Sequence, residues 1–216
     1  MSEAPKLDPA ETISLAWQPR ATRPVLASLF ALDRRVAGVV SRAREPMLAQ
    51  VRLAWWRERL SDALANANAG EPLITELAAC WGHHARGLHH VVDGWEALLG
   101  DAPLDEAALN AFADGRGRAL AAFAEVAGPA EEGAAALVAG RTWAFADLAT
   151  RSSHAGERTL ARSLGRDEPD LRIGSRSLRG IAVLGGLSRR ALDRGEPLME
   201  GRGGAVAAMR LGLFGR

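Results

Sequence analysis

The stretch from Arg23 to Leu60 constrains the fold most, because it carries two helical patterns in succession with one proline between them. In the first pattern, apolar residues recur at spacings of three and four, which places them along one face of an α-helix. They are Val25, Leu29, Leu32, Val36 and Val39. Proline suits the first turn of a helix but not its interior, so we expect one helix to end before Pro46 and a second to begin there.

The second helix carries two adjacent tryptophans and apolar residues on two faces. One face holds Leu53, Trp56, Leu60 and Leu64, and the neighbouring face holds Leu48, Val51 and Trp55. The pattern predicts a helix that buries both faces. Trp55 and Trp56 point about 100° apart on such a helix. Packing of both in the core is favoured, and the alternative is that one of them lines a groove or cavity.

Helix formers dominate the whole chain. It is rich in Ala, Leu, Arg and Glu, has no Tyr, and contains few runs of β-branched residues, so we predict an all-α fold. A length of 216 residues fits a single domain. We expect residues 1–10 to form a flexible polar leader, since Pro5 and Pro9 prevent a continuous helix, and residues 11–216 to form the helical domain.

Further helices are expected between Leu73 and the end of the chain. One of them begins near Asp105, a candidate N-cap, and contains the sequence GRGR at 115–118. No strand precedes these glycines, so a phosphate-binding loop is excluded there. We expect a helix bend or a close contact between helices instead.

Composition excludes several classes of function. The 27 basic and 26 acidic residues leave a formal charge of +1, which argues against nucleic acid as a partner. Cys80 is the only cysteine, so no intramolecular disulfide forms and a reducing compartment, the cytoplasm, is expected. The N-terminus lacks the apolar core of a secretory signal, and no run of roughly 18 apolar residues predicts a transmembrane segment. Peripheral contact with a membrane stays compatible with the sequence.

Four of the five histidines cluster in one region of the chain, at positions 83, 84, 89 and 90. Cys80 and His84 have the i, i+4 spacing of many metal ligands on helices, and His83 shares a face with His90. Zinc sites need further ligands, and we expect neither a nearby carboxylate nor a second thiol to complete the four. We therefore expect structural or exposed histidines and no metal site.

Two groups of arginines leave alternatives open. Arg141 and Arg151 lie on an otherwise apolar helix face, either in the wall of a polar cavity or at the edge of the core. From Glu157 onward there are 12 Arg against 7 Asp or Glu. A solvated face is favoured for these later arginines, and the alternative is attraction to anionic headgroups or to an anionic ligand.

Three segments together resemble the squalene/phytoene synthase family of head-to-head isoprenoid synthases. They are LASLFALDRRVAGVV, RLAWWRERL and the closing LRGIAVLGGLSRRAL with GGAVAAMRLGLFGR. The resemblance spans residues 11–216 and implies an isoprenoid-synthase-like helical bundle around a central cavity. It also implies the family's chemistry, in which two aspartate-rich motifs bind magnesium ions that hold the substrate diphosphates.

The carboxylates of both motifs are missing here. In the first motif Arg34 matches the family's arginine, but the carboxylate positions fall on Ala37, or its neighbour Gly38, and on Ser41. The second motif falls on Leu148, Arg151, Ser152 and Gly156, where only the arginine is retained. Asp33 and Asp147 are close in sequence but at the wrong helical phase. We therefore expect no catalytic carboxylate, no bound Mg²⁺ and no other cofactor.

With these departures the sequence resembles a non-catalytic branch of the family, which is related to a mitochondrial assembly factor for respiratory complex I. The resemblance implies a pseudoenzyme that acts as an assembly factor or as a lipid- or prenyl-binding factor. Its expected partners are an apolar lipid or prenyl ligand, or a subunit of a respiratory membrane complex at the inner membrane face. The candidate cavity residues are Arg34, Trp55, Trp56, Arg141 and Arg151.

The alternative is an active farnesyl or geranylgeranyl transferase with a displaced metal site. Substitute Mg²⁺ ligands would then be Glu58, Asp62, Asp114 or Asp147. This alternative requires at least two carboxylates to converge on one cavity.

Overall fold

Helices form all the regular secondary structure in the part of the chain that the computed structural model describes, residues 7–43, 45–65, 70–199 and 201–214. This confirms the prediction of an all-α fold. The α-helices are α1 Pro9–Trp17, α2 Arg23–Ser41, α3 Pro46–Ser61, α4 Pro72–Trp81, α5 His89–Glu96, α6 Glu106–Ala127, α7 Gly133–Arg151, α8 Ala155–Asp167, α9 Arg179–Arg194 and α10 Gly201–Phe214. Short 3-10 segments adjoin several of them, such as Gly82–Leu88 before α5.

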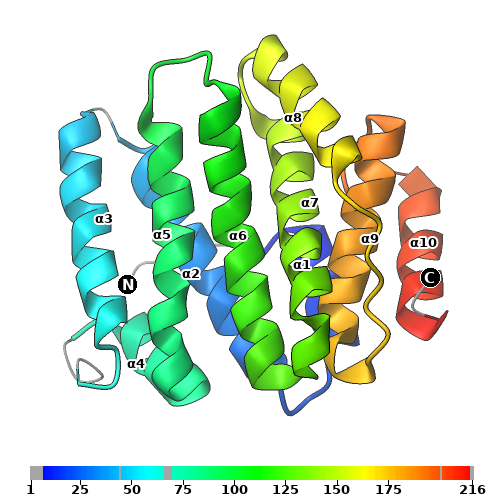
Figure 1. Ribbon diagram of the computed structural model, residues 1–216, viewed down its shortest axis with the longest axis horizontal. Coiled ribbons are helices and arrows are strands. Elements are labelled where there is room, and N and C mark those ends of the chain that lie inside the picture. The colour runs from blue at the N-terminus through cyan, green and yellow to red at the C-terminus, as the bar shows by residue number, and fades with distance from the viewer. Residues whose placement is uncertain (1–6, 44, 66–69, 200, 215–216) are drawn as a thin grey trace.

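The helices stack in two layers. In Figure 1, α3, α5, α6, α7, α9 and α10 stand side by side, while α1 and α2 lie behind this row. Four phenylalanines from α2, α6 and α7 are completely buried between the helices, and such aromatic side chains contribute strongly to a core. They are Phe30, Phe112, Phe123 and Phe145.

Glycines set the spacing around α6, which runs unbroken through the GRGR sequence. A Cβ atom added to Gly115 would lie 2.5 Å from the carbonyl oxygen of His90 on the 3-10–α5 segment. One added to Gly140 of α7 would lie 2.6 Å from the carbonyl oxygen of Arg116. These positions therefore require glycine so that the helix backbones can approach each other. Of the two expected explanations for the glycines, the structure shows the close contact between helices and not the bend.

Helix α1 begins inside the range 1–10 that was expected to be a flexible leader. Residues 1–6 lie outside the described part of the chain, and α1 already begins at Pro9. The Asp8 side chain accepts a hydrogen bond from the Ala10 amide at 2.9 Å, and the Glu11 carboxylate accepts one from the Asp8 amide at 3.0 Å. This reciprocal cap explains why the helix starts at the proline, which occupies its first turn.

Helix α3 buries one face, so the prediction of two buried faces was wrong. Leu53, Trp56 and Leu60 are buried, whereas Leu48 is 57% and Val51 64% exposed. The reason is the position of α3 at the edge of the row, where neighbours cover it from one side (Figure 1).

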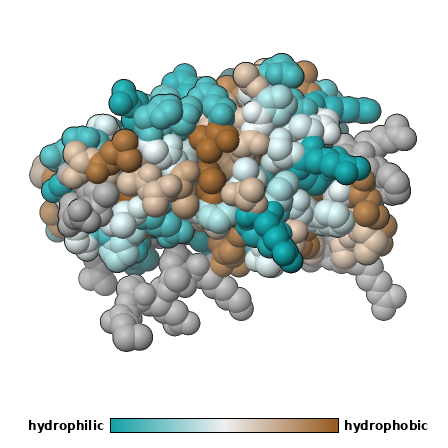
Figure 2. Space-filling model, turned by 90° about the horizontal axis from the view of Figure 1, so that it is seen from below, coloured by the Kyte–Doolittle hydropathy of each residue, from teal (hydrophilic) through white to brown (hydrophobic). Residues whose placement is uncertain are grey.

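Apolar side chains also reach other parts of the surface. Figure 2 shows hydrophobic residues interspersed with hydrophilic ones over the face seen from below. Isolated apolar residues of this kind are normal on protein surfaces. None of the helices in the described segments has the length and apolar character needed to span a membrane.

Candidate functional site

A cavity of about 560 Å³ lies where α1, α2, α6 and α7 meet the segment before α10. Its walls combine charged, aromatic and aliphatic side chains. They are contributed by Asp8, Pro9, Glu11, Asp33, Arg34, Ala37, Trp95, Arg116, Trp143, Asp147, Thr150, Arg151, Pro197, Leu198 and Met199. This is the central cavity expected from the sequence.

Arg116 of α6 forms the centre of the polar wall. Its side chain is only 4% exposed and pairs with two aspartates from facing helices. Nε and Nη2 donate to the two carboxylate oxygens of Asp33 at 3.0 and 2.7 Å, and Nη1 donates to Asp147 Oδ2 at 3.0 Å. The Asp33 pair is bidentate, the geometry that suits a guanidinium best.

The surroundings keep this arginine charged. Its guanidinium carbon lies 3.9 Å from the ring centre of Trp143, a favourable cation–π distance. Burial lowers the pKa of Arg116, but Asp33 and Asp147 more than compensate and raise it above its ordinary value. Trp95 adds a further hydrogen bond, from Nε1 to Asp33 Oδ1 at 2.9 Å. The two aspartates are thus held by permanent donors.

The other two arginines of the cavity are paired as well. Arg34 Nε donates to Glu11 at 2.7 Å. Arg151 donates to Asp147 Oδ1 at 2.7 Å and to Asp8 Oδ2 at 2.5 Å. Burial raises the pKa of Glu11 above its ordinary value, although Arg34 opposes this. Three guanidinium groups therefore face four carboxylates, and the wall carries no excess of positive charge.

The structure brings together some of the residues singled out from the sequence. Arg34, Ala37 and Arg151 line the cavity. Ser41 is exposed at the end of α2. Ala37 is thus the one expected carboxylate position of the first motif that faces the cavity, and its methyl group offers no ligand to a metal.

The second motif lies at the end of α7. Ser152 is the C-cap of that helix, and its hydroxyl hydrogen-bonds the Glu157 carboxylate. Gly156 is exposed in the first turn of α8. Neither residue belongs to the cavity wall.

Three candidate cavity residues lie elsewhere. Trp56 is buried in the core and Trp55 packs edge-on against it, with ring centres 5.1 Å apart. Arg141 donates to Glu168 at 2.7 Å and to Asn110 at 2.9 Å, and it also pairs with Asp114. These side chains connect helices rather than line the cavity.

Of the four substitute ligands, Asp147 alone reaches the cavity. Glu58 and Asp62 are exposed at the end of α3, and Asp114 is engaged by Arg141. Asp33, which the motif spacing placed at the wrong phase, does face the cavity. One signal in the sequence pointed to it, since Asp33 lies four residues after Leu29 and three before Val36, on the apolar face of α2.

Arg116 was not identified from the sequence. It lies between Gly115 and Gly117, whose pattern indicated only a helix bend or a close contact between helices. The contact is what brings α6 close enough to α7 for Arg116 to reach Asp147.

The comparison with known protein families agrees with this geometry. The family model of squalene/phytoene synthase matches residues 12–157, which is more than half of the chain and includes the wall residues from α2, α5, α6 and α7. The chain belongs to the squalene/phytoene synthase family. Neither the curated proteins nor the solved structures contain a match to it. The match ends in α8, so the resemblance of α9 and α10 to the family stays a prediction.

Magnesium does not fit the residues present. The ion takes oxygen ligands, usually carboxylates, in an octahedral arrangement. Among the described residues of the cavity, the carboxylates of Asp8, Glu11, Asp33 and Asp147 each already bind an arginine. A metal would have to displace these guanidinium groups.

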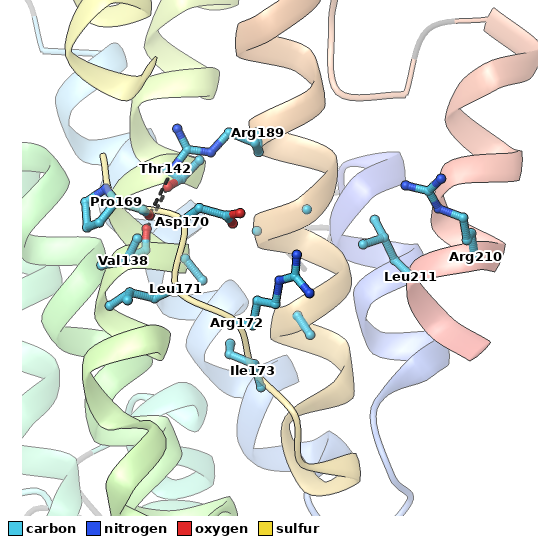
Figure 3. Close-up of a pocket in the computed structure, with 14 residues that line it drawn as sticks. Val138, Thr142, Pro169, Asp170, Leu171, Arg172, Ile173, Arg189, Arg210 and Leu211 are labelled. Carbon is cyan, nitrogen blue, oxygen red and sulfur yellow. Dashed lines mark hydrogen bonds between the residues drawn. The ribbon is translucent and has the colours of Figure 1, made fainter. Parts of the chain in front are cut away.

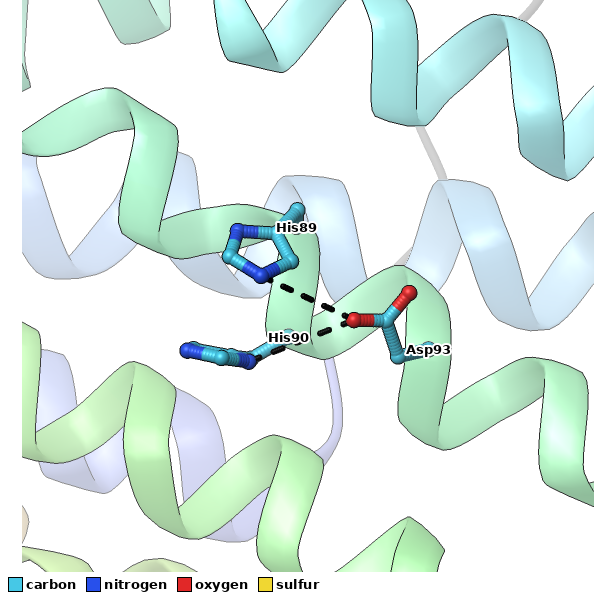
Figure 4. Close-up of side chains that lie close together, drawn as sticks. All are labelled: His89, His90 and Asp93. Atoms are coloured by element: carbon cyan, nitrogen blue, oxygen red, sulfur yellow. Dashed lines mark ion pairs between the residues drawn. The ribbon is translucent and has the colours of Figure 1, made fainter.

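A second polar cluster lies on α5 (Figure 4). Asp93 Oδ2 is 3.7 Å from His89 Nε2 and 4.0 Å from His90 Nδ1, so the expectation that no carboxylate lies near the histidines was wrong. Ligand atoms of the three residues lie within 4.8 Å of one another. Arg57 already donates to Asp93 Oδ1 at 2.6 Å, and structural zinc sites use four ligands. We therefore assign no metal to this cluster.

Proposed function

We propose that this chain is a non-catalytic member of the squalene/phytoene synthase family, acting as an assembly factor or as a binding factor for a lipid or prenyl chain. One observation carries the proposal. The buried guanidinium of Arg116 bridges Asp33 and Asp147, so a fixed protein cation stands between the two helices that carry the family's metal-binding motifs.

Charge supports the same proposal. A prenyl diphosphate brings several negative charges, and the family neutralises them with magnesium ions. Here the three arginines of the cavity are opposed by four carboxylates. A diphosphate without metal would meet a wall with no net positive charge, which disfavours its binding and its departure as a leaving group.

The remaining wall favours an uncharged ligand. Trp95, Trp143, Leu198 and Met199 offer apolar surface, and a volume of about 560 Å³ is within the usual range of ligand pockets. We therefore propose a prenyl or lipid chain without a diphosphate as the ligand. A role in assembling a respiratory membrane complex at the inner membrane face rests on the family resemblance alone.

The test is incubation of the purified protein with farnesyl and geranylgeranyl diphosphate and Mg²⁺, beside an active squalene synthase. We expect no prenyl product above background. Tryptophan fluorescence should change on addition of farnesol and much less on addition of farnesyl diphosphate, because Trp95 and Trp143 line the cavity. Turnover at an enzyme-like rate, about 1 s⁻¹ or faster, would contradict the proposal.

An active transferase with displaced ligands is the second candidate. The convergence of Asp33 and Asp147 on one cavity favours it, since two carboxylates from facing helices are what such an enzyme needs. If product forms, Asp147→Asn should abolish it and Asp114→Asn, which lies outside the cavity, should not. Activity retained in Asp147→Asn would exclude this site as its source.

A further inference from the structure

A second cavity of about 680 Å³ borders a different face of α7 and shares no residue with the cavity of the arginine–aspartate cluster. It is a groove over α9, at the point where Gly185 and Gly186 provide no side chains. Ala139 of α7 and Leu211 of α10 approach α9 closely at these glycines. Together with Val138, Ala182 and Ile173 they give the groove an apolar floor.

The loop between α8 and α9 forms one wall and is fixed at both ends. At its start, Arg189 of α9 donates to the carbonyl oxygens of Glu168 and Pro169 at 2.7 and 3.2 Å. At its end, the Glu132 carboxylate accepts from the amides of Gly174 and Ser175 at 2.7 and 2.9 Å. The wall between these anchors is therefore held in place before any ligand arrives, which lowers the cost of binding.

Arginines flank the apolar floor from both sides. Figure 3 shows Arg172 pointing from the loop toward α9, and Arg210 on the other side of that helix, on α10. Both side chains are exposed, and within the described segments neither forms an ion pair. With Arg189 they make three cations against one carboxylate, that of Asp170. The groove thus combines apolar surface with excess positive charge.

We propose that this groove binds a single-chain amphiphile with an anionic head, of the class of long-chain carboxylates. The alkyl chain lies on the apolar floor beside Val138, Ala182 and Ile173. The head lies at the rim, where Arg172 and Arg210 supply positive charge. The volume is within the range of pockets that enclose ligands of this size. The proposal is independent of the function proposed for the central cavity.

The experiment is a fluorescence titration of the full chain with dansylaminoundecanoic acid and, separately, with its uncharged methyl ester. The wild-type protein should bind the acid more tightly than the ester. The double variant Arg172→Ala/Arg210→Ala should bind the acid about tenfold more weakly, because it removes two exposed positive charges. Its affinity for the ester should change little. Ala182→Leu, which fills the floor, should weaken both.

The matched control is Arg52→Ala/Arg118→Ala, which removes two exposed arginines from α3 and α6. It should bind both probes as the wild type does, and circular dichroism should show that all variants are folded. Equal affinity for acid and ester would overturn the proposal, as would equal losses in the two double variants. Binding to vesicles of phosphatidylglycerol without binding of the free acid would also overturn it, because the arginines would then serve a membrane surface.

Discussion

A single guanidinium organises the polar side of the central cavity. Arg116 is fully enclosed by Trp143, Phe112 and two aspartates, and each of its three nitrogens donates a hydrogen bond. Desolvating such a group is costly, and the bidentate pair with Asp33 offsets that cost. Arg116 is therefore a structural cation, and its loss would leave Asp33 with the Trp95 indole and Asp147 with Arg151.

Arg116→Met should destabilise the protein by about 3–5 kcal/mol, because the buried carboxylate of Asp33 loses its cationic partner. Urea-induced unfolding would measure the free energy of unfolding. The control is Arg151→Met, whose side chain is 59% exposed although it also pairs with Asp147. That variant should lose about 1 kcal/mol or less. Similar losses in both variants would show that burial of Arg116 is not decisive.

At the scale of the helices, the contact between α6 and α7 depends on backbone approach rather than on interlocking side chains. Gly117 and Gly140 face each other there, and a Cβ atom on Gly140 would lie 2.8 Å from the Gly117 Cα atom. Since Arg116 is adjacent to this contact, the same glycines set the distance from its guanidinium to Asp147.

Gly140→Ala should therefore destabilise the protein by about 1–3 kcal/mol, because the new methyl group meets backbone atoms that cannot move independently. Gly133→Ala, in the same helix, is the matched control, since a Cβ atom there has no neighbour within 4 Å. It should be neutral or stabilising by up to about 1 kcal/mol. Thermal unfolding of both variants would compare them, and a stabilising Gly140→Ala would contradict the close contact.

At the scale of the whole molecule, hydrogen bonds join the two ends of the chain. Gln18, which follows α1 and is 1% exposed, donates to the Ser177 carbonyl at 2.6 Å and accepts from the Gly180 amide at 2.9 Å. Ser14 donates to the Gly180 carbonyl at 2.9 Å. Helix α9 is thereby attached to α1, which itself supplies Glu11 to the central cavity.

Gln18→Ala should cost about 1–3 kcal/mol, because the buried amide of Gly180 loses its acceptor. Hydrogen exchange of the amides in the first turn of α9 should accelerate in this variant more than exchange in α3. Gln50→Ala, at an exposed position of α3, is the control and should change neither quantity. An unchanged rate of hydrogen exchange in α9 would show that the hydrogen bonds from Gln18 do not stabilise this helix.

The sequence alone determined the helices and the family, because helix periodicity, caps and proline positions act over a few residues. The stripe of Val25 to Val39, the start of α3 at Pro46 and the cap at Asp105 all needed no distant partner. The same local information predicts that Ala37 and Ser152 stand at two of the family's carboxylate positions, and this placement stays a prediction from spacing.

Only the tertiary structure decided which side chains share a cavity and which faces are covered. Arg116 joins Asp33 and Asp147 across 83 and 31 residues of sequence, and no local pattern encodes that meeting. For the same reason the sequence did not show that Trp55 lies outside the cavity wall or that Leu48 is exposed. Burial depends on what packs against a helix, and that is set by contacts between segments far apart in the chain.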